Sequence, residues 1–426
     1  MRFDNLSDWL RWQEQLHFTE VDPGLDRISQ VWQRLNGVTQ LAYPVVTIAG
    51  TNGKGSSVAM LDAILRSAGY KTGCYTSPHL LDYNERICIA GQCCDDDAIC
   101  QAFQQIDDVR GDISLTYFEF ATLAAILIFN QQQIDIAILE VGMGGRLDAV
   151  NLFEPDISLI TPISLDHTAW LGEDKESIAY EKAGIIRADK PVVCSEPEPA
   201  NAIINKAKQL NAPLYCSQRD YHVENHSESW SWSNHQQTYH HLPKPNLTGD
   251  YQVQNAAAVL QVVSLLAKQF TISEPDVRAA LETVTLAGRF QQFSGDVDII
   301  LDVTHNQQGA KNLAQLLAET AYSGQTFAVL AMLKDKDVSA VVESMSTQID
   351  RWYLASLFGS RGLAVSDLAA EFYQLSSVPP LNKYNSVIEA FQQANSDAKP
   401  GDRIIAFGSF HTVEAVMHLL HRNDRR

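Results

Sequence analysis

The chain is poor in positive charge. Its 426 residues include 32 Lys and Arg against 51 Asp and Glu, which gives a formal net charge of −19 at pH 7. Binding to nucleic acid needs a basic surface that meets the phosphates, and docking on an anionic membrane needs clustered Lys and Arg. The composition therefore argues against both kinds of partner, and we expect neither nucleic acid nor membrane.

Long hydrophobic runs and a secretory leader are also missing. No apolar run approaches the roughly 18–20 residues that cross a bilayer. The first 16 residues contain Asp4, Asp8 and Glu14 without an apolar core, unlike a signal peptide. Seven cysteines occur, but no two have C-x-x-C spacing, and reduced thiols are the simplest interpretation. We expect a cytoplasmic enzyme that acts on small molecules.

Strands of the buried type alternate with helices in the first part of the chain. Pro44–Ala49 is a β-branched run, and a glycine-rich turn and the helical spacing of Ser56–Gly69 follow it. Phe118–Phe129 is apolar and long enough for a buried helix. Further apolar strands are predicted at Ile134–Val141, Ile157–Ile163 and Pro191–Cys194. This alternation predicts a largely parallel sheet covered on both faces by helices.

Residues 221–241 break the pattern, because they are polar with alternating aromatics such as Trp230 and Trp232. They predict a short antiparallel hairpin or a surface excursion. Five of the twelve histidines lie here without the spacing of a tetrahedral zinc site, so we expect a solvated hairpin. These histidines are His222, His226, His235, His240 and His241. Earlier in the chain, Asp95–Asp97 is expected to lead into a helix N-terminus, where negative charge is favourable.

A second βα series begins near Arg289. Its strands are predicted at Val297–Val303, Phe327–Met332, Arg351–Ala355 and Arg403–Phe407, and its helices near Gly309–Glu319, Ser366–Tyr373, Ser386–Ala394 and His411–Leu420. The expected fold class is α/β, with a mostly parallel sheet domain over residues 1–287 and a smaller Rossmann-like domain over 288–426. Ligands of such sheets bind at the carboxyl ends of the strands, and a site between two domains is the default expectation.

The sharpest motif is the heptapeptide G-T-N-G-K-G-S at residues 50–56, between a strand and a helix. Its glycines let backbone N–H groups converge on phosphate oxygens, and the helix N-terminus favours negative charge. Lys54 supplies a positive charge for the β- and γ-phosphates. The motif differs from a strict Walker A sequence because Ile48 occupies the position of the first glycine and Gly55 separates Lys54 from Ser56. We predict nucleotide binding; the alternative is a glycine-rich turn that only starts a helix.

Polar residues at predicted strand ends indicate a cation and an anion site. Glu140 closes one strand, and Asp166-His167 follows the next. A carboxylate at this position suits a nucleotide-bound cation, whereas histidine is a less usual ligand for Mg²⁺. In the second series, Arg289 suits a phosphate, and Asp302 suits a ribose or an ammonium group. A structural cap is the alternative for each residue alone.

Together these elements resemble the Mur ligase superfamily and, within it, the folylpolyglutamate synthases, whose P-loop has the form G-T-N-G-K-G-S. The resemblance continues in order through T-S-P-H-L (76–80), N-E-R-I (84–87), L-E-V-G-M-G-G-R-L-D-A-V-N (139–151), S-L-D-H-T (164–168), E-K-A-G-I (181–185), G-R-F (288–290), D-V-T-H-N (302–306), M-L-K-D-K-D (332–337) and G-S-F-H-T-V (408–413). T-Y-F-E-F (116–120) is similar to the pterin-side signature of the bacterial bifunctional members. Two departures are Thr304 and Gln307, where the family usually has A-H-N-P, and Gly249–Gln252, where it often has His-Gln before Asn255.

The resemblance implies a set of site residues. ATP would be held by Thr51, Asn52, Gly53, Lys54, Gly55, Ser56, Asn255 (adenine), Arg289 (phosphate) and Asp302 (ribose). Mg²⁺ would be held by Ser77, Glu140 and His167, and a second Mg²⁺ by Lys182 carboxylated to N6-carboxylysine. L-Glutamate would lie near His305 and Ser409. The pterin pocket would be lined by Asp22, Pro23, Gly24, Phe118, Glu119, Phe120, Ala121, Leu147, Asp148 and Ala149. The residues expected to act in catalysis are Lys54, Lys182, His305 and Arg289, and a monovalent cation is a further candidate cofactor.

The implied activity is an ATP-dependent carboxylate–amine ligase that adds L-glutamate to dihydropteroate and to reduced folates through an acyl phosphate. One alternative is a monofunctional folylpolyglutamate synthase. A cell-wall amino-acid ligase is less favoured, because only 49 residues precede Gly50 where those ligases carry a further domain. A nucleotide-binding module without ligation chemistry is less favoured because the second series has its own Arg, Asp and His. We expect a monomer.

Overall fold

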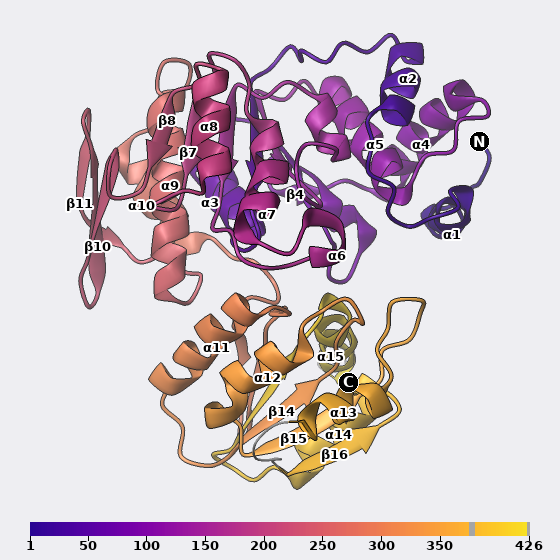
Figure 1. The fold of residues 1–426 in the computed structure, drawn as a ribbon, viewed down its shortest axis with the longest axis vertical. Helices are drawn as coiled ribbons and strands as arrows, with labels where there is room; N and C mark the ends of the chain where they lie inside the picture. The colour runs from indigo at the N-terminus through magenta and orange to yellow at the C-terminus, as the bar shows by residue number, and fades with distance from the viewer. Residues whose placement is uncertain (375–379, 424–426) are drawn as a thin grey trace. The chain divides into compact units, whose positions relative to one another are not determined.

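The computed structural model describes residues 1–374 and 380–423, and the chain divides into two compact units (Figure 1). The first unit comprises Met1–Ile163, Leu171–Asn246 and Gln252–Thr285. The second comprises Ser164–Trp170, Leu247–Tyr251 and Leu286–Arg426. Two short segments of the N-terminal part of the chain, 164–170 and 247–251, therefore pack with the second unit, although the chain on either side of each belongs to the first.

An eight-stranded sheet forms the centre of the first unit, in the order β4-β3-β2-β5-β1-β6-β7-β8. Its strands are β1 Val45–Ala49, β2 Thr72–Tyr75, β3 Ile87–Ile89, β4 Gln92–Cys93, β5 Ile136–Glu140, β6 Ile157–Ile160, β7 Val192–Cys194 and β8 Leu214–Cys216. In this order, all neighbouring strands from β2 to β8 pair in parallel, whereas the pairs β2–β3 and β3–β4 are antiparallel. Every residue of β1, β5, β6 and β7 is buried, which is why these strands have predominantly apolar sequences. The predicted mostly parallel sheet is confirmed.

Helices pack against this sheet in two main groups. One group contains α1 Leu6–Leu16, α2 Asp26–Arg34, α4 Asp96–Arg110 and α5 Tyr117–Gln132, which contact one another. The other contains α3 Lys54–Ser67, which contacts β1, β2 and β5, and α10 Glu274–Thr283 behind it. The remaining helices with residues in this unit are α6 Thr168–Leu171, α7 Lys175–Lys182, α8 Asn201–Gln209 and α9 Asp250–Leu266, with the 3₁₀ turns η1 Tyr83–Arg86, η2 Ala149–Leu152 and η3 Ala183–Ile185. Asp95 caps α4 through the N–H of Ala98, as predicted for the acidic run.

The segment after β8 is a separate antiparallel sheet of three strands, β9 Tyr221–Asn225, β10 Ser229–Asn234 and β11 Thr238–Pro243. The expected antiparallel pairing is present, but the expected hairpin of two strands is a sheet of three. Trp230 and Trp232 are fully buried, and the indole N–H of Trp232 donates to the carbonyl of Ala257 on α9 at 3.0 Å. One face of the sheet therefore packs on the unit. The five histidines of the segment are exposed, as predicted.

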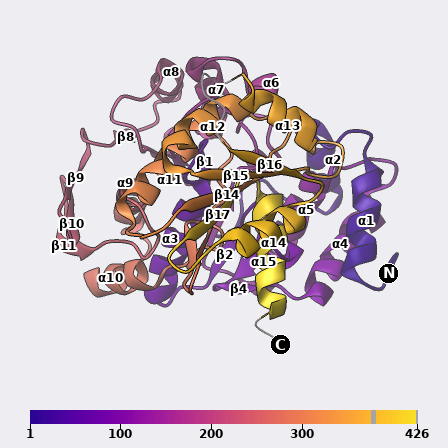
Figure 2. The ribbon, with the colours of Figure 1, turned by 90° about the horizontal axis from the view of Figure 1, so that it is seen from below.

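A six-stranded sheet in the order β12-β13-β17-β14-β15-β16 forms the second unit. Its strands are β12 Gln291–Phe293, β13 Asp298–Leu301, β14 Thr326–Leu330, β15 Arg351–Ala355, β16 Leu381–Tyr384 and β17 Arg403–Phe407. All pairs are parallel except β12–β13. Figure 2 shows α11 Gln307–Glu319, α12 Val338–Met345 and α13 Val365–Phe372 on one face, and α14 Val387–Asp397 and α15 Phe410–Asn423 on the other. The 3₁₀ turn η4 Ser346–Gln348 follows α12.

Three elements of the second unit were absent from the sequence prediction: α12 and the edge strands β12 and β16. The edge strands are short and half exposed, with the sequences Q-Q-F and L-N-K-Y, so no apolar run marks them. Over residues 1–374 and 380–423, none of the helices is both long and apolar enough to cross a membrane.

Candidate functional site

The sheet order of the first unit explains why the predicted phosphate and metal residues converge. β1 leads into the glycine-rich loop, its neighbour β5 ends at Glu140, and β2 on the far side of β5 leads to Ser77. Because these three strands are parallel and adjacent, their carboxyl ends meet at one edge of the sheet. The backbone N–H of Ser77 donates to the carboxylate of Glu140 at 3.2 Å.

The glycine-rich loop has a backbone that only glycine allows at two positions. Gly50 has φ +153° and Gly53 has φ +89°. A Cβ at Gly50 would collide with Thr161 Oγ1 at 1.7 Å, and a Cβ at Gly53 would lie 2.6 Å from Asn255 Oδ1. The loop is therefore packed against its neighbours at these two positions, and it is fixed further by the N–H groups of Thr51 and Asn52, which donate to the carbonyl of Pro162 at 3.1 and 3.4 Å. It leads into the N-terminus of α3, where the helix favours negative charge.

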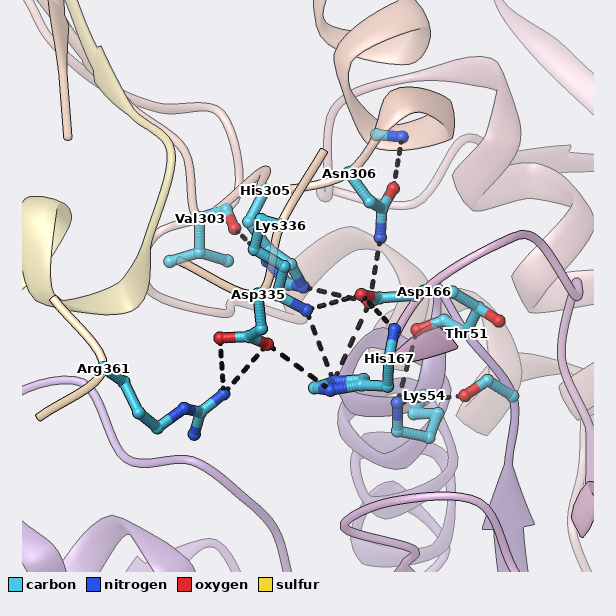
Figure 3. Close-up of polar contacts among 12 residues, drawn as sticks. Thr51, Lys54, Asp166, His167, Val303, His305, Asn306, Asp335, Lys336 and Arg361 are labelled. Carbon is cyan, nitrogen blue, oxygen red and sulfur yellow. Dashed lines mark hydrogen bonds and ion pairs between the residues drawn. The ribbon is translucent and has the colours of Figure 1, made fainter. Parts of the chain in front are cut away.

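Two lysines meet the carbonyl of Gly50 in this loop. Lys54 Nζ donates to the carbonyls of Gly50 and Thr51 at 3.1 and 3.3 Å (Figure 3). Lys182, at the end of α7, is 4% exposed, and its Nζ donates to the same Gly50 carbonyl at 2.9 Å. Lys182 is therefore a buried lysine beside the glycine-rich loop and not a surface residue. The other predicted ATP residue of this unit, Asn255, donates to Gln252 Oε1 at 3.0 Å and packs on Gly53.

The oxygen atoms of Glu140 and Ser77 at this edge are of the kind that a hard divalent cation prefers, because they belong to a buried carboxylate and a hydroxyl. Glu140 is 5% exposed, and such a carboxylate is costly to bury unless it meets positive charge or N–H donors. Among the residues that the structure describes, no three His, Cys, Asp or Glu side chains form a ready ligand cluster. Of the three predicted ligands, Ser77 and Glu140 lie together, whereas His167 belongs to the second unit.

The three segments predicted to line a pterin pocket also converge within the first unit. The N–H of Gly24 donates to the carbonyl of Leu147 at 3.2 Å, which joins the first segment to the third. The ring of Phe118 lies against Gly142, 2.7 Å from the position of a Cβ there, and its centroid is 5.6 Å from that of Tyr75. Phe118 and Asp148 therefore approach the same glycine-rich turn, 142–145, from two sides, since Asp148 accepts from the N–H of Met143 at 2.9 Å.

Two predicted pterin residues lie in the hydrophobic core. Phe120 is fully buried and contacts the rings of Trp9, Trp12 and Phe103, and Ala121 is also fully buried. They hold α5 against α1 and α4. Ala149 is 4% exposed and begins η2, where the side chain of Asp148 caps the turn through the N–H of Val150.

Arg27 was not among the residues predicted from the sequence. It links the first predicted pterin segment, 22–24, to the second, 118–121. Its guanidinium donates to the carboxylate and the backbone carbonyl of Asp22, both at 2.6 Å, and pairs with Glu119 at 3.3 Å. Asp22 also meets His17 Nε2 at 3.0 Å. Glu119 is 3% exposed and forms a capping box with Thr116 at the start of α5. No spacing in the sequence relates Arg27 to Glu119, 92 residues away.

Burial raises the pKa of Asp148 to about 6, although the N–H groups of Met143, Val150 and Gly142 and the charge of Lys54 oppose this shift. The turn at 142–145 that Asp148 contacts follows Glu140 at the end of β5, and β5 pairs with β1, which leads into the glycine-rich loop. Both segments therefore lie at the same edge of the first unit's sheet.

In the second unit, the predicted residues His305 and Ser409 follow two neighbouring strands, β13 and β17. Lys336, which was not among the predicted site residues, lies in the loop after β14, on the other side of β17. Asp302 is 3% exposed, and its carboxylate accepts from the N–H groups of Phe290 and Thr304, each at 2.8 Å. It thus shapes the turn as well as being a predicted ribose ligand. The guanidinium of Arg289 lies 5.9 Å from the ring centroid of Phe410, and Ser409 is 4% exposed.

Asp166 is the centre of a charged cluster in this unit (Figure 3). Its carboxylate pairs with Lys336 at 2.5 Å and with His305 Nε2 at 3.4 Å, and it accepts from Asn306 Nδ2 at 3.4 Å. The side chains of Asp166 and Lys336 are 8% and 4% exposed. Burial alone would raise the pKa of Asp166, but His305, Lys336 and His167 hold it well below its usual range. Lys336 belongs to M-L-K-D-K-D; its place after a strand was the available signal.

His167 lies beside this cluster with a left-handed backbone, at φ +51°. Its ring nitrogens lie 3.8 Å from Asp335 and 3.4 Å from Lys336 Nζ, and Asp335 in turn pairs with Arg361 at 3.1 Å. Burial lowers the pKa of His167 to about 4, so the ring is neutral near pH 7, the form in which histidine binds metals.

Comparison with known proteins identifies the class that this fold and site define. Residues 48–263 match the Mur ligase middle domain, and residues 288–410 match the glutamate ligase domain of Mur ligases. The chain is 40% identical over 415 residues to the dihydrofolate synthase/folylpolyglutamate synthase of Escherichia coli strain K12, covering 97% of this chain and 95% of that protein.

Solved structures agree. The structure of Escherichia coli FolC in complex with DHPP and ADP has a TM-score of 0.92 at 39% identity and covers 99% of both chains. A bifunctional folylpolyglutamate synthase/dihydrofolate synthase with Mn, AMPPNP and L-glutamate bound has a TM-score of 0.89 at 41% identity over 98% of both chains. The chain therefore belongs to the dihydrofolate synthase/folylpolyglutamate synthase family of Mur ligases, and the resemblance and fold class predicted from the sequence are confirmed.

Proposed function

We propose that this protein is an ATP-dependent ligase that joins L-glutamate to dihydropteroate and to reduced folates. The observation that carries the proposal is internal to the first unit. The glycine-rich loop follows β1, and the turn at 142–145, which Phe118 and Asp148 contact, follows the neighbouring strand β5, so the predicted phosphate and pterin residues share one edge of one sheet. The relatives are named dihydrofolate synthase/folylpolyglutamate synthase, which supports the same activity. The related structures hold ADP, AMPPNP, Mn, L-glutamate and DHPP.

The reaction needs activation because a carboxylate repels an amine and has no good leaving group. The substrate carboxylate attacks the γ-phosphorus of ATP, giving an acyl phosphate and ADP. The neutral amine of glutamate then attacks the acyl carbon, and the tetrahedral intermediate loses phosphate to leave the amide. The amine proton passes to solvent or to phosphate. The protein contributes positioning and positive charge rather than covalent chemistry.

The proposed residues have separate roles. Lys54 and the loop of Thr51, Asn52, Gly53, Gly55 and Ser56 hold the phosphates, Asn255 the adenine, Asp302 the ribose, and Arg289 stabilises the charge on the transferred phosphoryl group. His305 and Ser409 orient glutamate. Asp22–Gly24, Phe118–Ala121 and Leu147–Ala149 form the pterin side, with Phe120 and Ala121 acting through the packing of α5.

The cation site is part of the proposal. Ser77, Glu140 and His167 would hold Mg²⁺, and Lys182, carboxylated on Nζ, would hold a second Mg²⁺; a monovalent cation is a further candidate. When bound, Mg²⁺ neutralises charge on the phosphates during transfer. The position of Lys182, buried with its Nζ beside the glycine-rich loop, supports this assignment. The charge of −19 gives no general attraction for anionic substrates, so activity should depend strictly on the metal.

One assay tests the activity. The full chain is mixed with ATP, Mg²⁺ and L-glutamate, with either dihydropteroate or a reduced folate, and ADP release and the mass of the pterin product are followed. We expect both acceptors to gain a glutamyl residue. Gain with the reduced folate alone would establish a monofunctional folylpolyglutamate synthase. If neither acceptor stimulates ADP release above the reaction without L-glutamate, the proposal is refuted.

A further inference from the structure

The edge of the first unit's sheet carries a pair of thiols that the proposed activity does not use. β3 and β4 form a hairpin through the two-residue turn Ala90-Gly91, in which both residues have positive φ, as in a type I′ turn. In this register Cys88 lies directly opposite Cys93. Their sulfurs are 3.2 Å apart, and all seven cysteines of the chain are free thiols.

The hydrogen-bond pattern of the hairpin brings these two residues close. The N–H of Cys94 donates to the carbonyl of Ile87 at 2.9 Å, one step beyond the pair, so Cys88 and Cys93 are a non-hydrogen-bonded pair. In such pairs the Cα atoms are about 4.5 Å apart, and the side chains approach most closely. This separation lies within the range of about 4.4–6.8 Å that disulfides span.

The neighbouring thiols are less well placed to react. Cys94 follows Cys93 directly, so its side chain points to the opposite face, because successive side chains of an extended chain alternate. Cys74 lies on the other side of Cys88, but it is buried and donates to Asp62 Oδ1 at 3.3 Å. Cys93 is the exposed member of the group, so an oxidant in solution meets it first.

We propose that Cys88 and Cys93 are a modification site at which a peroxide forms a reversible intramolecular disulfide. The peroxide oxidises the exposed Cys93 thiol to a sulfenic acid and is itself reduced to water. The sulfur of Cys88 then attacks the Cys93 sulfur and displaces hydroxide, which takes the Cys88 proton and leaves as a second water. The balance is two thiols and one hydrogen peroxide to one disulfide and two waters. A dithiol reductant reverses the change.

The pair lies next to a segment of the proposed metal site. β3 pairs with β2, and Thr76 binds the carbonyls of Arg86 and Glu85 at 3.0 and 3.2 Å, one residue before Ser77. The Cys88 thiol also donates to the carbonyl of Glu85 at 3.5 Å.

Since the sulfurs are already close, the disulfide should form without unfolding the hairpin.

The test uses limited hydrogen peroxide on the full chain, then alkylation of the remaining thiols and digestion with trypsin. Cleavage after Arg86 and Arg110 gives one peptide that contains Cys88, Cys93, Cys94 and Cys100. We expect the peptide to lose two hydrogens and to be alkylated only at Cys94 and Cys100, with all four sites recovered after dithiothreitol.

Three variants sharpen the result. Cys88→Ser and Cys93→Ser should each abolish the loss of two hydrogens, whereas Cys94→Ser, the matched control, should retain it. The proposal is overturned if Cys88 stays fully alkylated after oxidation, if Cys93 pairs with Cys94, or if the disulfide links two chains on a non-reducing gel. None of these readouts depends on ligase activity, so this test and the activity assay fail independently.

Discussion

The substitution Arg27→Met tests whether the pterin segments are held together as the contacts indicate. The change removes two hydrogen bonds of 2.6 Å to Asp22 and the ion pair with the buried Glu119. Hydrogen bonds to charged groups contribute about 1.5–3 kcal/mol each. Because the side chains of Arg27 and Asp22 are 25% and 31% exposed, solvent screening places their link at the low end of that range. A total loss of roughly 3 kcal/mol follows, centred on the 22–24 loop.

This loss should appear as weaker pterin binding. Each 1.4 kcal/mol corresponds to a factor of ten, so we expect KM for dihydropteroate to rise on the order of 10- to 100-fold. KM for ATP should change little, because Arg27 lies on α2 and its guanidinium bonds to Asp22 and Glu119, whereas the glycine-rich loop follows β1. Steady-state ADP release with each substrate varied in turn measures both values. Arg27→Lys, which keeps the charge but loses the paired geometry, should have an intermediate effect.

Arg34→Met is the matched control. Arg34 lies in the last turn of the same helix, and its guanidinium donates to the backbone carbonyls of Val109 and Arg110. It should lower thermal stability without selective loss of pterin binding. The reasoning is refuted if the two variants raise the pterin KM equally, or if Arg27→Met stays folded and leaves that KM unchanged.

Three further predictions follow from the same structure. Lys54→Ala should abolish turnover in the ADP-release assay while leaving the circular dichroism spectrum unchanged, and a near-normal rate would contradict its assignment to the phosphates. Burial raises the pKa of Asp148 from 3.8 to about 6, so the native state holds a proton between about pH 4 and pH 6 that the unfolded chain has lost. Stability should therefore fall by about 3 kcal/mol as pH rises through that window, and urea unfolding of Asp148→Asn should lack this slope. Lys336→Met removes the closest cation from the buried Asp166, leaving His305 near it, and should destabilise the protein by about 3 kcal/mol, measured by thermal unfolding. Lys334→Met, two residues away and with a side chain bonded to the Ser360 carbonyl, should have a much smaller effect.

Much of the architecture could be predicted because buried parallel strands leave a local signal. The runs at β1, β5, β6 and β7 are mostly apolar since both faces of the sheet are covered. The helix at 118–129 was predicted because it is likewise apolar on nearly every side. The edge strands β12 and β16 face solvent, so their sequences lack that signal. The sequence predicted a solvated hairpin where the structure has the three-stranded β9–β11 sheet. The few buried residues of these strands, such as Trp230 and Trp232, are surrounded in the sequence by polar residues, so the local pattern does not show that one face is covered.

The site shows the same division. The glycine-rich loop, Glu140 and the residues after β13 were found because each stands directly after a strand, where a parallel sheet presents ligands. Lys336 lies further along its loop, since β14 ends at Leu330, so its position gives a weaker local signal. Arg27, by contrast, acts on Asp22 and on Glu119, and the second of these partners is 92 residues away.

The acidic composition, the short motifs and their order determined the family, the fold class and the phosphate loop by themselves. These depend on local chemistry and on strand–loop–helix patterns that neighbouring residues encode. The tertiary structure decided which of these residues meet. It set Asp166 against Lys336, tied two pterin segments to Arg27, raised the pKa of Asp148 and placed Cys88 opposite Cys93. Each of these depends on strand order, register and burial, which bring distant residues together and remove water, and no local pattern records them.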